Sequence, residues 1–251
     1  MAKAQIIINA DDFGYSPAIN YAIMDSHLDG ILTSTTMMAN GKGFDHAVNL
    51  SKSMPHLGIG VHLVLSYGKS LTQNKTLTDS KGYFHGLKYL EENIAQIDLE
   101  ELEKEWESQI LKIREAGIPI THLDSHHHVH SMPALTPVFE KLALRYDLPV
   151  RNNAKYQSNL KKPHRFETNF DSIAIEPEHR LRSYLNNILM DAKTYGSVEL
   201  MCHPGYIDQY LIEGSSLLDN RARVAHFLQH SDFKEFLQKH SEIELIHFGE
   251  L

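Results

Sequence analysis

The 251-residue sequence has a single cysteine, Cys202, and it lacks any long apolar run. One cysteine forms no internal disulfide, which fits a reducing cytoplasm. The apolar run at residues 6–8 is too short for a signal-peptide core, and no segment reaches the ~18 apolar residues of a membrane span. Basic residues are also scarce: 24 Lys and Arg stand against 32 Asp and Glu, a net charge of -8. We therefore expect a cytoplasmic protein that binds neither a membrane nor nucleic acid.

The apolar content is ordinary, at 42% hydrophobic residues, and it is sufficient for a substantial core. We expect one domain over residues 1–251, with an irregular insertion near residues 67–97, where little periodicity is present. Long structureless insertions in compact domains are often functional. The oligomeric state is not readable from the sequence, and a homodimer is one alternative.

Apolar, β-branched segments alternate with segments of helical periodicity along the chain. Strands are predicted at residues 6–10, 31–38, 57–65, 118–124, 148–151, 198–202 and 243–247, and helices at 17–30, 44–53, 98–117, 133–145, 178–193, 217–230 and 232–239. Ser16 is expected to cap the first helix, and Asp98 with Glu101 to form a capping box on the third. Residues 152–177 are predicted to be irregular.

This alternation predicts parallel βαβ units and an α/β fold. Seven strands suggest a distorted seven-stranded (β/α) barrel of the glycoside hydrolase/deacetylase type, with an open doubly wound sheet as the alternative. In both architectures the functional site lies at the carboxyl ends of the strands. Candidate residues can therefore be judged by their place along the strands.

Polar residues with metal-binding chemistry cluster at these strand ends. Asp11 and Asp12 follow the first predicted strand, His62 lies late in the third, and His126 follows the fourth. Two imidazoles and one carboxylate suit a divalent metal with open positions, and on ligand grounds Zn²⁺, Co²⁺ or Mn²⁺. Any one of these residues alone could equally be a satisfied polar group. Together they predict a metal site of Asp12, His62 and His126.

Histidine is unusually frequent, with 17 in the chain and five between residues 122 and 130. We take His126 as a ligand, and Asp124 and His128 as residues that could orient the imidazoles. Spacing alone does not decide between His126 and His128. A solvated polar turn is the plainer alternative for this segment.

Two further residues suit acid–base chemistry. Amide hydrolysis needs a base that deprotonates water and an acid that protonates the leaving amine. Asp11, beside the metal site, is the candidate base, although it could instead simply pair with a cation such as Arg151. His203 follows the strand at 198–202, and the Pro-Gly after it forces a sharp turn. It is the candidate acid, with a fourth metal ligand or a surface histidine as alternatives.

These residues lie in motifs that occur in a familiar order, and the sequence resembles the YdjC-like carbohydrate deacetylases, most closely their chitooligosaccharide deacetylase branch. The motifs that carry the resemblance are Asn9-Ala10-Asp11-Asp12-Phe13-Gly14, Thr33-Ser34-Thr35-Thr36, Gly60-Val61-His62-Leu63, the segment from His122 to His130, and Met201-Cys202-His203-Pro204.

The resemblance implies a distorted barrel and a metal, often described as Mg²⁺, at Asp12, His62 and His126. It also implies Asp11 as base and His203 as acid. The implied substrates are short N-acetylglucosamine oligomers such as chitobiose, phosphorylated or not, and the implied products are acetate and a free amine. The C-terminal residues 246–251 depart from the Tyr-Arg-Asp ending associated with the family. Two other functions stay open: a metal-dependent hydrolase of another amide or of a phosphoester, and a non-catalytic sugar-binding regulator.

Overall fold

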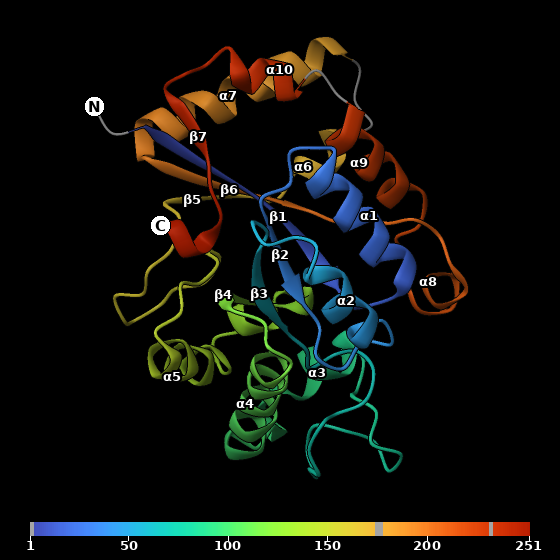
Figure 1. Ribbon diagram of the computed structural model, residues 1–251. Coiled ribbons are helices and arrows are strands. Elements are labelled where there is room, and N and C mark those ends of the chain that lie inside the picture. The colour runs from blue at the N-terminus through green and yellow to red at the C-terminus, as the bar shows by residue number, and fades with distance from the viewer. Residues whose placement is uncertain (1–2, 174–177, 231–232) are drawn as a thin grey trace.

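A computed structural model describes residues 3–173, 178–230 and 233–251 of the chain. Its centre is a seven-stranded parallel sheet with the order β4-β3-β2-β1-β6-β5, in which β7 also pairs with β1. The strands are β1 (Ala4–Phe13), β2 (Ser34–Met37), β3 (Gly58–Leu63), β4 (Ile120–Ser125), β5 (Arg165–Glu167), β6 (Ser197–Cys202) and β7 (Ile243–Leu245). Figure 1 shows the sheet curled, with helices around its outside.

The sheet forms a half-barrel and does not close among the described residues. No strand pairing joins the edge strands β4 and β5 there. The strand expected at residues 148–151 is reduced to one bridge, between Leu123 and Val150. The actual edge strand, β5, lies in the stretch expected to be irregular, of which residues 174–177 lie outside the described residues. The α/β class and the parallel sheet are therefore confirmed, whereas a closed seven-stranded barrel is not.

Among the described residues, seven helices lie close to where periodicity predicted them, and three more, at residues 87–93, 170–173 and 209–214, were not expected. They are α1 (Pro17–Leu28), α2 (Phe44–Ser51), α3 (Leu87–Asn93), α4 (Leu99–Glu115), α5 (Thr136–Tyr146), α6 (Phe170–Ile173), α7 (Glu178–Tyr195), α8 (Gln209–Gly214), α9 (Asp219–His230) and α10 (Phe233–Gln238). The Ser16 side chain caps α1 as expected, accepting a hydrogen bond from Ile19 N. Asp98 caps α4 by accepting from the backbone of Glu100 and Glu101.

The insertion near residues 67–97 is partly regular, because it contains α3 and the 3-10 helix η1 (Ile94–Gln96). Carboxylates of α4 bind its backbone. Glu101 does not form the expected capping box but accepts hydrogen bonds from Lys75 N and Thr76 N, and the buried Glu105 accepts from Leu71 N. These hydrogen bonds satisfy backbone amides of the insertion, so the Glu101 side chain makes a tertiary contact in place of the local cap.

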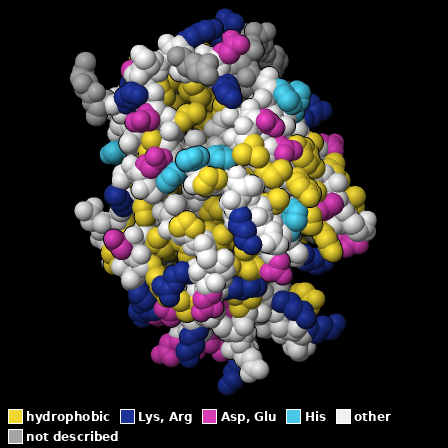
Figure 2. All heavy atoms as spheres, viewed as in Figure 1, with side chains coloured by type: hydrophobic (Ala, Val, Ile, Leu, Met, Phe, Trp, Pro, Cys, Tyr) yellow, Lys and Arg dark blue, Asp and Glu magenta, His cyan; other side chains and the backbone are white. Residues whose placement is uncertain are grey.

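β1 lies in the middle of the sheet, and nine of its ten residues are buried. Ile6, Ile7 and Ile8 are fully buried, as expected for a strand covered on both faces. No helix within the described ranges is long and apolar enough to span a membrane. On the molecular face seen in Figure 2, basic and acidic side chains are interspersed rather than gathered by sign. That face therefore offers no extended basic surface.

Candidate metal and catalytic site

The carboxyl end of β1 carries two consecutive carboxylates, Asp11 and Asp12. Successive side chains of a regular strand point to opposite faces, so a regular β1 would separate them. The register between β1 and β2 shifts between Ala10 and Phe13, and Asp12 adopts a left-handed φ of 72°. Such a bulge turns the strand locally, and Asp tolerates left-handed backbone better than most residues. Asp11 and Asp12 consequently line the same cavity.

Asp12 lies against the two histidines that the sequence analysis grouped with it. Its Oδ1 is 3.1 Å from His126 Nδ1 and 3.5 Å from His62 Nε2. Asp12 is 1% exposed and His126 9% exposed. The strands β1 and β3 and the residue directly after β4 thus bring together ligand atoms that all lie within 4.8 Å of one another.

The donor set fits a divalent metal. Metal–ligand bonds of ~2.0–2.2 Å in a tetrahedral arrangement place ligand atoms roughly 3.3–3.6 Å apart, close to the separations around Asp12 Oδ1. That oxygen is buried and has no hydrogen-bond partner among the described residues, as expected of an atom available to a cation. A second group, Asp11, His62 and Asp124, is also close enough, but its two carboxylates are already engaged by Arg151.

His62 is oriented by a carboxylate behind it. Its Nδ1 lies 2.7 Å from Asp124 Oδ1, and Thr36 Oγ1 donates to Asp124 Oδ2 at 3.1 Å. This contact leaves Nε2 facing Asp12, the arrangement that commonly orients metal-binding histidines. Burial alone would lower the pKa of His62, but Asp124 and Asp11 raise it to about 10.

Asp12 has a second partner that the sequence analysis missed. Arg221 of α9 donates from Nη2 to Asp12 Oδ2 at 2.6 Å, and Arg221 is buried. Burial would raise the pKa of Asp12, whereas Arg221 and His126 lower it well below its usual range. Arg221 lies 209 residues from Asp12 on a helix predicted only from periodicity, so no local motif marked it.

Asp11 is held by a bidentate ion pair with Arg151, one of the alternatives considered from the sequence. Arg151 Nη1 and Nη2 donate to its two oxygens at 2.9 and 2.7 Å. Burial would raise the pKa of Asp11, but Arg151 lowers it, so Asp11 is ionised. The fully buried Arg151 also contacts Asp124 at 2.9 Å and Glu199 at 2.8 Å. Burial raises the pKa of Glu199 to about 8, so this carboxyl carries little charge at neutral pH.

His203, after β6, faces Asp11 from the other side. Its Nε2 is 3.8 Å from Asp11 Oδ2, while its Nδ1 lies 2.6 Å from Asp171 Oδ2. The backbone N–H of His203 also donates to Asp171 Oδ1. Burial would lower the pKa of His203, but the hydrogen bond that its Nδ1 donates to Asp171 raises it. Asp171, on the short helix α6, is a second contact that sequence reasoning missed.

The five histidines between 122 and 130 have different environments. His122 stacks on Phe248 in the core, and His130 is also fully buried. His126, His127 and His128 line the cavity. Burial lowers the pKa of His127 and of His128 to about 4, so both are neutral. His128 makes no hydrogen bond to another imidazole among the described residues and therefore lacks the orienting contact expected of it.

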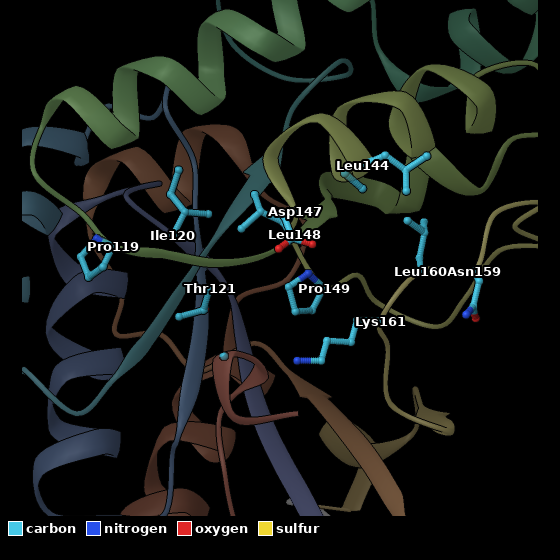
Figure 3. Close-up of a pocket in the computed structure, with 12 residues that line it drawn as sticks. Pro119, Ile120, Thr121, Leu144, Asp147, Leu148, Pro149, Asn159, Leu160 and Lys161 are labelled. Atoms are coloured by element: carbon cyan, nitrogen blue, oxygen red, sulfur yellow. The ribbon is translucent and has the colours of Figure 1, made fainter.

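The cavity over these residues has a volume of about 530 Å³, and apolar and aromatic side chains from Tyr15, Tyr67 and Leu87 complete its wall. Small-ligand sites typically measure ~300–1,000 Å³ and combine apolar walls with a few polar groups. A cavity of about 600 Å³ at the start of β4 contains only Asp147 and Lys161 as charged residues (Figure 3). The candidate site is therefore distinguished from this second cavity by its ionisable and metal-binding side chains, not by its volume.

A protein-family model described as "YdjC-like protein" matches residues 5–239. The chain belongs to the YdjC-like family. The carbohydrate deacetylase of Brevibacillus brevis is 36% identical, over 98% of this chain and 99% of its own length. The carbohydrate deacetylase of Clostridium beijerinckii is 38% identical, over 98% of this chain and 100% of its own.

A solved structure shares the fold of this YdjC-like chain closely. A cellobiose-phosphate cleavage protein from Enterococcus faecalis superimposes with a TM-score of 0.88 at 32% identity, covering 100% of this chain and 99% of that one. A protein from Agrobacterium tumefaciens, with a TM-score of 0.55 at 12% identity, shows a likeness of fold alone. The half-barrel therefore recurs at very different levels of sequence identity.

Proposed function

We propose that this protein is a metal-dependent carbohydrate N-deacetylase that releases acetate from short N-acetylglucosamine oligosaccharides such as chitobiose. The observation that carries the proposal is the position of an ionised carboxylate, Asp11, between a metal-binding group and a histidine of raised pKa. Hydrolysis of an amide needs these three elements at one point. The names of the relatives supply the substrate class, and the name of the Enterococcus protein favours testing phosphorylated disaccharides as well.

Asp12, His62 and His126 would hold one divalent cation, which when bound lowers the pKa of a water and polarises the acetyl carbonyl. Two nitrogen ligands favour Zn²⁺, Co²⁺ or Mn²⁺ over Mg²⁺, which usually prefers oxygen ligands. A binding protein without catalysis would need neither Asp11 nor His203, and the presence of both favours an enzyme.

Asp11 acts as the general base. Arg151 keeps the carboxylate ionised and fixes its orientation through two hydrogen bonds, while Asn9 Nδ2 donates to Asp11 Oδ1 at 3.0 Å. Held in this way, Asp11 takes a proton from the water that attacks the acetyl carbon.

His203 acts as the general acid. Its Nδ1 is occupied by Asp171, so the other ring nitrogen, Nε2, faces the cavity and Asp11. Asp171 favours the protonated imidazole, and this form donates its proton to the sugar nitrogen as the C–N bond breaks. Cys202, by contrast, is fully buried and burial raises the pKa of its thiol, so it is unsuited to act as a nucleophile.

The test is acetate release from a panel of chitobiose, phosphorylated chitobiose, N-acetylglucosamine, a non-sugar acetamide and a phosphoester, with wild-type protein and Asp11→Asn. We expect acetate from an N-acetylated sugar, and a loss of at least ~100-fold in Asp11→Asn with its metal content unchanged. Wild-type rates in Asp11→Asn would refute the base assignment. Turnover of the phosphoester or the non-sugar amide alone would refute the substrate class.

A further inference from the structure

Two consecutive residues of the histidine segment have an unusual backbone. His127 and His128 both adopt a left-handed φ of 54° inside the 3-10 helix η2 (His126–Ser131). For residues other than glycine this conformation is strained, and it persists only where the surrounding structure requires it. Its effect here is that three successive imidazoles line one cavity.

The two side chains differ in their partners. His127 is exposed, and its Nδ1 lies 2.8 Å from Ser66 Oγ. His128 Nδ1 is buried and has no hydrogen-bond partner within the described part of the chain. An unpaired buried polar atom is costly, and few occur in native proteins. His127 thus has Ser66 as a partner, whereas no hydrogen bond to the His128 side chain is found within the described part of the chain. Because His128 Nδ1 is buried, Nε2 is the ring nitrogen that a ligand in the cavity can reach.

His128 is also held in place on the wall that carries the base. Its ring packs edge-on against Phe166 of β5, with 5.8 Å between centroids and an interplanar angle of 88°. The Arg151 guanidinium lies 5.0 Å from the centroid of the same Phe166 ring. Phe166 thus fixes His128 on the side of the cavity where Arg151 holds Asp11.

Metal binding does not explain His128. The groups of described residues close enough to share an ion are Asp12, His62 and His126, and Asp11, His62 and Asp124. A sugar hydroxyl, in contrast, both donates and accepts hydrogen bonds, so it can pair with His128 Nε2 in either tautomer of the ring.

We propose that His128 is a substrate-positioning residue that hydrogen-bonds a ring hydroxyl of the sugar and so places the acetamide over Asp11. This inference rests on the proposed deacetylase function. The left-handed backbone at His127 and His128 is the conformational cost of bringing this imidazole to the cavity.

The backbone geometry allows a sharp test. His128→Gly removes the imidazole and relieves the left-handed strain, so the variant should unfold at the same temperature as wild type or higher. Its kcat/KM for chitobiose should fall about 10-fold, the loss of one hydrogen bond. His128→Gln offers an amide near the position of Nε2, so it should recover part of the activity.

The matched control is Asp147→Gly. Asp147 has a left-handed φ of 52° at the end of α5 and lines the cavity at the start of β4 (Figure 3), away from the candidate site. This variant should show the same thermal behaviour with unchanged kcat/KM. The contrast separates relief of backbone strain from loss of the imidazole.

Monodeoxy analogues of chitobiose complete the test. One analogue, which lacks the hydroxyl that pairs with His128, should be turned over by wild type about 10-fold less efficiently than chitobiose. Wild type and His128→Gly should turn over this analogue equally well, because neither can form the hydrogen bond. Wild-type kcat/KM in His128→Gly, or a loss that persists with every analogue or accompanies a loss of bound metal, would overturn the proposal. Absence of acetate release by wild type would instead refute the proposed function itself.

Discussion

Replacing Arg151 with methionine should destabilise the metal-free protein by ~3–5 kcal/mol at pH 7, the usual cost of leaving a buried charge unpaired. Arg151 is 0% exposed and contacts Asp11, Asp124 and Glu199. These three carboxylates do not contribute equally. Glu199, with its pKa raised to about 8, carries little charge, and Asp124 keeps His62 at 2.7 Å. In Arg151→Met, about one carboxylate charge, chiefly that of Asp11, is therefore left without a partner.

The sign of the pH dependence follows from the same contacts. In wild type Arg151 lowers the pKa of Asp11 and of Asp124 against the effect of burial. This stabilisation is fully present above the ordinary carboxyl pKa of ~4 and is lost as the pH falls through the lowered values. In Arg151→Met, burial is no longer opposed and these pKa values rise. The loss of unfolding free energy in Arg151→Met should thus be largest at pH 7 and should shrink towards pH 5.

The assay is denaturant unfolding in the presence of a chelator at both pH values. Arg165→Met is the matched control, because Arg165 has a 53% exposed side chain and lies 4.0 Å from Asp191, so it should change the unfolding free energy by less than ~0.5 kcal/mol. A deficit in Arg151→Met below ~1 kcal/mol, or one that grows on acidification, would refute the reasoning.

Two further predictions concern residues that act through a histidine. Asp171→Asn removes the carboxylate that raises the pKa of His203, so the alkaline limb of the pH profile of kcat/KM should move to lower pH; an unmoved limb would show that His203 is not the acid. Asp124→Asn removes the charge behind His62 and should weaken metal binding ~10- to 100-fold in a chelator competition, whereas unchanged affinity would argue against His62 as a ligand.

Much of the fold was predictable because its signals are local. Apolar periodicity and caps such as Ser16 and Asp98 located the main helices within a few residues. The edge of the sheet was not predictable. Residues 148–151 are apolar enough for a strand, yet they make only one bridge, while the short β5 contains two charged residues among its three. Pairing with β6, not composition, makes β5 a strand.

The candidate site, like the fold, has residues that the sequence predicted and others that it did not. Asp11, Asp12, His62, His126 and His203 lie in recognisable motifs at strand ends, and the structure brings them to one cavity. Their partners come from distant segments without a motif of their own. These partners could not be identified from the sequence, because α6, α9 and β6 approach the end of β1 only in the folded sheet. They are Asp171, Arg221 and Glu199. The left-handed Asp12 that aligns the two carboxylates was equally invisible in the sequence.

The most direct test of the central claim is a titration of the chelator-stripped protein with a divalent cation, recording bound metal and acetate release together. We predict that acetate release from chitobiose rises in proportion to bound metal and saturates at one ion per chain, and that His62→Ala or Asp12→Ala abolishes both. Full activity in the stripped protein, or unaltered binding of the ion in these variants, would contradict the account.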